Sequence, residues 1–312
     1  MIQQNKYFQD LKIFLNSPLQ SHQVLHIDLN KNQIGDEGAQ NLGFSLAKCT
    51  NLSKLVLDLN ENKIGAIGVS GIGSALEKCK NLSNLTLNID KNQIDDKSAS
   101  QLGSALANCT NLSNLTLNLR CNNIGTIGVQ GLGLALAKCI NLSNLELNLG
   151  VNQINAIGTS SLGFSLAECS NLSNLILYLQ SNQIGDEGVL GLSFALGKCT
   201  NLSNLELCLQ FNQIGDESVL GLGSALTKCT NLSNLTLDLG FNQIGNEGAS
   251  SLGFALSKFT NLSNLELSLD QNQIGDDGAQ GLGSGLGKCN NLQKLVLALS
   301  YFHQFKIKVQ TK

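Results

Sequence analysis

A repeat of thirty residues constrains the fold of this chain more than any other feature of its sequence. Rows cut every thirty residues from Ser21 align without a gap, giving nine full units to Asn290 and a tenth that stops after its first half. The unit reads NLSNLTLNLxxNQIGDEGAxGLGSALAKCT, and its positions are numbered here from one to thirty. Self-similarity at such a period is typical of a solenoid, in which each unit packs only against its neighbours.

The two halves of the unit have different hydrophobic periods. Leucine or isoleucine at positions five, seven and nine alternates with polar residues, and this period of two predicts a strand with one buried face. Apolar residues at nineteen, twenty-two, twenty-six and twenty-nine form one stripe of a helix. Strands stack about 4.8 Å apart and helices about 8–10 Å apart, so the array must bend. We therefore expect an α/β horseshoe with parallel strands on its concave face and helices on its convex face.

Two positions are expected to shape the turn between strand and helix. Position fifteen is Gly except at Asp95 and Asn155, and these three residue types tolerate a positive φ, so we expect a left-handed turn there. Position twelve is always Asn, whose amide bonds a loop backbone of its own and the next unit in the expected structural ladder. The ladder consists of Asn32, Asn62, Asn92, Asn122, Asn152, Asn182, Asn212, Asn242 and Asn272.

Composition limits the compartment and the class of ligand. The net charge of −3 argues against nucleic acid as the main ligand, and no apolar run approaches the length of a membrane span. Eight of the ten cysteines occupy position twenty-nine, where Phe259 replaces one of them, so we expect a buried apolar slot with free thiols. Free thiols, recurring glycosylation sequons on the strand face and the lack of a signal peptide predict a cytoplasmic protein. No motif predicts a metal or a cofactor.

The string L-x-x-L-x-L-x-L-x-x-N-x-I, as in Leu112 to Ile124, resembles a leucine-rich repeat. The following I-G-D-E-G-A and L-G-S-A-L-A are similar to the long-unit, ribonuclease-inhibitor-like subclass, which includes the activator of the Ran GTPase. An extra x-L pair lengthens the strand motif, as in expanded repeat arrays of protists. The resemblance implies a horseshoe fold and binding to a protein, with GTPase regulation or enzyme inhibition of the ribonuclease-inhibitor type as alternatives.

Variation on the strand face is concentrated at positions six, eight, ten and eleven. The most unusual patch lies in the sixth to eighth units, where aromatic and apolar residues interrupt a face of Asn and Thr. Such a patch is typical of a binding hot spot, although aromatic residues at position eleven can also tuck under the loop edge. Acidic residues share this face and favour a partner with a basic patch. The predicted partner-binding residues are Ile176, Tyr178, Glu206, Cys208, Phe211, Asp238 and Phe241.

Arg120 is the chain's only arginine and completes the set of predicted binding residues. It lies at position ten, and we expect an unpaired side chain at the rim of the concave face. Regulators of phosphoryl transfer often supply an arginine, so Arg120 is the residue on which the GTPase alternative depends. No paired carboxylates, triad or kinase signature accompanies it, and we do not expect an enzyme.

The ends of the array are expected to be capped. Residues 1–20 form a predicted capping segment with an amphipathic helix, residues 21–290 the nine repeats, and residues 291–312 a partial repeat and tail. The tail, in which Phe302 replaces the ladder Asn, predicts either a capping strand or an open edge. The oligomeric state and the partner's identity are not specified by these patterns.

Overall fold

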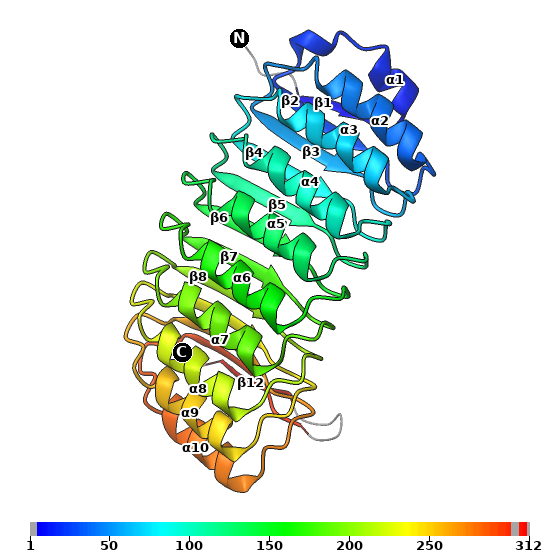
Figure 1. Ribbon diagram of the computed structural model, residues 1–312. Helices are drawn as coiled ribbons and strands as arrows, with labels where there is room; N and C mark the ends of the chain where they lie inside the picture. Colours follow the sequence, from blue (N-terminus) through cyan, green and yellow to red (C-terminus); the bar gives the residue numbers. More distant parts are fainter. Residues whose placement is uncertain (1–4, 301–305, 311–312) are drawn as a thin grey trace. The chain divides into compact units, whose positions relative to one another are not determined.

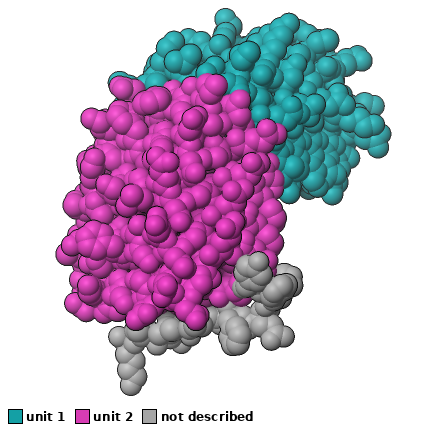
Figure 2. Space-filling view, turned by 60° about the horizontal axis from the view of Figure 1, so that its bottom comes forward, with its two compact units in different colours: residues 1–153 teal, residues 154–312 magenta. Residues whose placement is uncertain are grey.

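A computed structural model describes residues 5–300 and 306–310 of the chain. The chain divides into two compact units, Met1–Gln153 (unit 1) and Ile154–Lys312 (unit 2), which are coloured separately in Figure 2. Each unit alternates strands with helices, and its helices form a row on one side of its strands (Figure 1).

Unit 1 contains six described strands in sequence order, each paired in parallel with the next. The strands are β1 (Asn5–Phe8), β2 (Val24–Asp28), β3 (Lys54–Asp58), β4 (Asn84–Asn88), β5 (Asn114–Asn118) and β6 (Asn144–Asn148). The helices are α1 (Leu11–Leu15), α2 (Gly35–Leu46), α3 (Ala66–Leu76), α4 (Asp96–Leu106) and α5 (Thr126–Leu136), with a 3₁₀ turn at Leu19–Ser21.

Unit 2 follows the same order with one change at its end. The helices are α6 (Ala156–Leu166), α7 (Gly185–Leu196), α8 (Asp216–Leu226), α9 (Asn246–Leu256) and α10 (Asp276–Leu286). The strands are β7 (Asn174–Tyr178), β8 (Asn204–Cys208), β9 (Asn234–Asp238), β10 (Asn264–Ser268), β11 (Lys294–Ala298) and β12 (Lys306–Gln310). Strands β7 to β11 are parallel, and β12 pairs antiparallel with β11.

The core lies between the strands and helices of each unit, as the two periods predict. Leu115, Leu117 and Leu119 are at most 2% exposed, and so is Cys139 at position twenty-nine. All ten cysteines are free, and nine of them are buried. Burial raises the pKa of thiols such as Cys79 and Cys199 to about 11, so they stay protonated and apolar at neutral pH.

The side chains of the Asn ladder form hydrogen bonds with the backbone of the preceding repeat. Asn212 is fully buried, and its Nδ2 donates to the Leu179 carbonyl of the preceding repeat at 2.9 Å and to Leu209 at 3.1 Å. Its Oδ1 accepts from the Asn182 backbone N–H at 3.2 Å. The amide thus joins its own repeat to the preceding one, not to the next as expected. Asn32, which has no preceding loop of this kind, is exposed.

The prediction of a left-handed turn at position fifteen is wrong for most repeats. Only Gly35 and Gly185 have a positive φ there, whereas position eleven has a positive φ in all nine full repeats. The nine residues are Lys31, Glu61, Lys91, Cys121, Val151, Ser181, Phe211, Phe241 and Gln271.

In the other seven repeats position fifteen serves instead as the helix N-cap. Where it is Gly, an acceptor at position sixteen of the preceding repeat usually supplies the missing cap: Asp96 Oδ1 accepts from the backbone N–H groups of Gly125 and Gly128 at 2.7 and 2.8 Å. Where the preceding repeat has Ala66, Asp95 caps its own helix by accepting from the Ser98 N–H at 2.8 Å. The repeats therefore exchange capping groups, which satisfy free N–H groups at each helix start.

The N-terminal segment differs from the expected amphipathic helix. Its described part begins with β1, which extends the parallel sheet of unit 1, and only five residues (Leu11–Leu15) are helical. Phe14 is fully buried, and the Phe8 and Phe14 rings lie 5.3 Å apart. At the other end β12 covers the edge of β11, while Phe302 lies outside the described residues.

Candidate functional site

The strand face of unit 2 brings together most of the residues predicted to bind a partner. Most side chains at positions six and eight are half-buried and lie side by side on the face away from the core. Ile176 is the register partner of Glu206, and Tyr178 is that of Cys208, which in turn neighbours Asp238 on β9. Three adjacent strands therefore contribute to one continuous surface.

The side chains at positions ten and eleven, just beyond each strand, are called the rim below. On the rim of unit 2, the rings of Phe211 and Phe241 stack with centroids 4.3 Å apart and planes 16° apart. The rings are 49% and 42% exposed, so the alternative that they tuck under the loop edge is wrong. Both residues have a positive φ, which is rare for a bulky side chain and costs about 1 kcal/mol. An exposed aromatic pair held in this way is a preformed apolar contact surface.

Carboxylates lie on the strands of the same surface. Glu206 and Asp238 are half-buried on β8 and β9, and Glu266 on β10 is exposed. Cys208 lies among them and is only 9% exposed, which corrects the prediction that its side chain belongs to the contact surface. Burial, followed by the charges of Glu206 and Asp238, raises the pKa of its thiol to about 12. A thiol held protonated in this way is a poor nucleophile at neutral pH.

Position ten has buried acceptors without a hydrogen-bond donor in both units: Asn60 Oδ1 and Asp90 Oδ1 in unit 1, and two amide oxygens in unit 2. Gln180 Oε1 and Gln210 Oε1, at position ten of neighbouring repeats, are buried and accept no hydrogen bond. A rotation of either terminal amide would present its oxygen to a ligand without breaking a bond to that oxygen. No sequence signal indicates this feature, because Gln at a solvated position is unremarkable.

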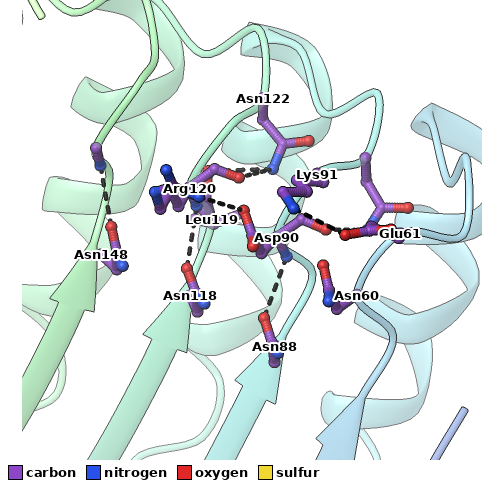
Figure 3. Close-up of polar contacts among 12 residues, drawn as sticks. Asn60, Glu61, Asn88, Asp90, Lys91, Asn118, Leu119, Arg120, Asn122 and Asn148 are labelled. Atoms are coloured by element: carbon purple, nitrogen blue, oxygen red, sulfur yellow. Dashed lines mark hydrogen bonds and ion pairs between the residues drawn. The ribbon is translucent and has the colours of Figure 1, made fainter. Parts of the chain in front are cut away.

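The rim of unit 1 is built from charges that pair with one another (Figure 3). Arg120 Nη1 lies 3.9 Å from Asp90 Oδ1, so the expected unpaired arginine is in contact with an acid of the preceding repeat. At position eleven, Lys91 Nζ donates to Glu61 Oε1 at 2.8 Å, and Lys31 Nζ lies 3.7 Å from Glu61 Oε2. The hydrogen bond from Lys91 lowers the pKa of Glu61, while desolvation raises the pKa of Asp90.

The described residues contain no group of three His, Cys, Asp or Glu side chains able to hold a metal ion. Within the same residues, no helix is long and apolar enough to cross a membrane. What unit 2 does present is an aromatic, acidic surface whose chemistry suits binding.

A family model described as "Leucine Rich repeat" matches residues 20–43, 48–73, 111–133, 173–193, 231–253 and 261–283. A comparison with curated proteins finds no match.

Several solved structures are similar to this chain at low identity. A Listeria monocytogenes internalin is 22% identical, with a TM-score of 0.45, 92% of this chain covered and 82% of that one. The ectodomain of the Arabidopsis receptor kinase HAESA, solved with a peptide hormone, is 22% identical, with a TM-score of 0.49, 82% of this chain covered and 36% of that one. A Leptospira interrogans leucine-rich-repeat protein is 17% identical, with a TM-score of 0.37 and coverages of 95% and 94%.

The family-model matches fall in six of the thirty-residue units, and each compact unit of the structure alternates the strands and helices that such repeats form. The chain is therefore a leucine-rich-repeat protein.

Proposed function

We propose that this protein is a non-catalytic scaffold that binds a protein partner on the strand face and rim of unit 2. The observation that carries the proposal is the exposed, stacked pair of Phe211 and Phe241, together with the half-buried Tyr178 on β7. Aromatic anchors next to a polar surface supply much of the free energy of protein–protein association. Leucine-rich-repeat proteins commonly use their strands in this way.

The charge of the surface indicates the partner. Glu206, Asp238 and Glu266 lie on three neighbouring strands, and the strand positions of residues 174–270 contain no Lys, Arg or His. A partner that places a basic residue beside an apolar one would satisfy both features. The two amide oxygens of Gln180 and Gln210 would accept N–H donors from the same partner.

Several finer assignments belong to this proposal. We place the repeats in the ribonuclease-inhibitor-like subclass, similar to protist arrays, with residues 21–290 as the binding array and residues 1–20 and 291–312 closing its ends. We also propose a reducing, cytoplasmic location on account of the ten free cysteines. No particular residue supports GTPase regulation or nuclease inhibition. Arg120, on which the GTPase alternative depends, lies against Asp90.

The test is affinity capture from reduced lysate with three baits, read by quantitative mass spectrometry. The baits are wild type, a unit 2 variant with Tyr178, Phe211 and Phe241 changed to Ala, and a matched unit 1 variant with Lys31, Glu61 and Lys91 changed to Ala. We expect one or more partners to be lost with the unit 2 variant and kept with the unit 1 variant. Identical recovery with all three baits would overturn the assignment, provided that thermal melts show all three folded.

A further inference from the structure

The helix face of unit 2 carries a second exposed apolar surface that the binding proposal does not use. Phe164 on α6, Leu190 and Phe194 on α7, and Leu220 on α8 are 56%, 36%, 47% and 58% exposed. They occupy position twenty, which holds Ser or Gln in every other repeat, and position twenty-four, which holds Ser in four other repeats and Phe or Leu in three. We call these four residues the helix-face patch. Apolar side chains gathered on adjacent helices mark an interaction site more often than singly scattered ones.

Glycines bring two of these helices close together. A Cβ at Gly163 on α6 would collide with the backbone carbonyl of Gly191 on α7, so neither position has room for a side chain. The close approach places the Phe164 and Phe194 rings 5.1 Å apart at an angle of 55°. The patch is therefore continuous across α6 and α7.

On α7 and α8 charges of opposite sign lie at the two ends of the patch, whereas α6 has Ile157 and Glu168 at the same repeat positions. Glu187, Leu190 and Phe194 on α7 and Lys198, two residues past its end, are exposed and spaced three, four and four apart, so the lysine continues one stripe of the helix. Lys198 Nζ lies 5.8 Å from the centre of the Phe194 ring. Within the described residues, neither Glu187 nor Lys198 forms an ion pair. Along the chain, the stripe therefore consists of an acidic residue, two apolar residues and a basic residue.

A stripe with this order is complementary to its own reverse. If a second α7 packs antiparallel on the first, Glu187 of each molecule faces Lys198 of the other, and Leu190 lies within about one residue of the opposite Phe194. A twofold axis makes every such contact twice, as in the interfaces of most homodimers.

The neighbouring helix fits the same twofold axis. An axis that reverses α7 also sets α8 against α8 of the second copy. Glu217, Leu220 and Ser224 on α8 and Lys228, two residues past its end, repeat the spacing, and all four are exposed. Glu217 of each molecule therefore faces Lys228 of the other. We propose that the helix-face patch of α6, α7 and α8 is a self-association surface on which two copies of this chain pack antiparallel.

The charge arrangement favours a second copy over a membrane surface. An anionic bilayer would attract Lys198 and Lys228 but repel Glu187 and Glu217 at the other end of the same helices. An antiparallel copy pairs all four charges. The contact is only three helices wide, so we expect a dimer that dissociates in the micromolar range.

Sedimentation-velocity centrifugation of the full chain over a range of micromolar concentrations tests the proposal. We expect wild type to shift from monomer to dimer, and Phe194→Glu to weaken the dimer about 30-fold or more. Phe254→Glu is the matched control, because Phe254 occupies the same repeat position on α9, is 65% exposed and lies outside the patch. We expect this control to dimerise like wild type. A wild type that stays monomeric, or equal dimerisation of both variants, would overturn the proposal.

A charge-reversal series tests the antiparallel geometry with substitutions that leave the apolar surface intact. Glu187→Lys alone sets lysine against lysine in the homodimer, and Lys198→Glu alone sets glutamate against glutamate, so each should dimerise more weakly than wild type. A mixture of the two variants restores opposite charges at both ends and should form a heterodimer. Homodimers of each single variant as stable as wild type, or no gain on mixing, would contradict the antiparallel pairing.

Discussion

The two rims of the molecule use the same repeat positions in different ways. In unit 1 the rim is charged, and its charges contact one another: Arg120 lies against Asp90, and Glu61 lies between Lys31 and Lys91. In unit 2 the same positions hold Phe211 and Phe241, whose stacked rings face solvent. The backbone that supports them is alike in both units, with a positive φ at position eleven throughout. The difference shows that the same repeat backbone can support a rim of paired charges in unit 1 and a rim with an exposed aromatic pair in unit 2.

The prediction with the largest expected effect tests whether the Asn ladder stabilises both units equally. Asn122→Ala in unit 1 and Asn212→Ala in unit 2 each remove a buried amide that donates to backbone carbonyls of two repeats. We expect both to lower the free energy of unfolding by about 3 kcal/mol, because buried carbonyls and N–H groups lose their partners. The measurement is denaturant unfolding, with Asn32→Ala as the control.

Asn32 is exposed and its Nδ2 donates only to Asn30 O, so we expect its substitution to have little effect. If the losses in free energy of unfolding differed widely between Asn122→Ala and Asn212→Ala, the two units would not share the same supporting backbone. The comparison of their rims would then fail.

The next prediction concerns a variant in which the rim of unit 2 carries an ion pair like that of unit 1. Phe211→Glu combined with Phe241→Lys replaces the stacked rings by an ion pair at neighbouring repeats, as in Glu61 and Lys91. We expect a captured partner to bind about 30-fold more weakly or worse, because truncating or replacing buried aromatic anchors removes about 2 kcal/mol or more. Titration of the partner by calorimetry measures the change. Unaltered affinity would mean that both rims are ordinary surface.

Exchange of capping groups between repeats gives a smaller effect in both units. Asp96 in unit 1 and Asp216 in unit 2 accept hydrogen bonds from the first N–H groups of the following helix. Substitution of either by Ala should cost about 1 kcal/mol. Asp276→Ala is the matched control, since Asp276 begins α10, the last described helix, and has no following helix to cap. Equal losses at all three sites would show that the helix dipole, not the cap, accounts for the stabilisation.

The smallest effect concerns the ion pairs of the unit 1 rim. Lys91→Ala removes the hydrogen bond that lowers the pKa of Glu61. A lowered carboxyl pKa stabilises the fold above the unfolded pKa of about 4.3, and this contribution is lost as pH falls through the folded value. The pair is exposed, so we expect little change in stability at pH 7. The ¹³C chemical shift of the Glu61 carboxyl, followed by NMR, should titrate at a higher pH in the variant.

The fold follows from the sequence because burial has a clear period in each half of the repeat. The core leucines of the strands and the buried stripe of the helices lie where that period places them. The left-handed turn could not be placed in the same way, because Lys31, Cys121 and Phe211 share it and have no chemistry in common. The turn between strand and helix imposes a positive φ at position eleven, without the glycine that usually reveals such a turn.

The capping pattern was present in the sequence but spans two repeats. Asp95 follows Ala66, and Asn155 follows Thr126, whereas Gly at position fifteen mostly follows Asp or Asn at position sixteen of the preceding repeat. Comparison of neighbouring rows, rather than columns alone, would have found it. The candidate site divides similarly: the sequence predicted the aromatic cluster, but only the structure shows that Cys208 is buried and that Arg120 has a partner.

Hydroxyl-radical footprinting of the protein alone and with its captured partner tests the binding surface most directly. Phe211 and Phe241 are exposed on the rim of unit 2, while Phe44 and Phe254 are exposed on helices and serve as internal references. We predict that the partner strongly slows oxidation of Phe211 and Phe241 and leaves the rates at Phe44 and Phe254 unchanged. Unprotected Phe211 and Phe241 in a saturated complex would contradict the account.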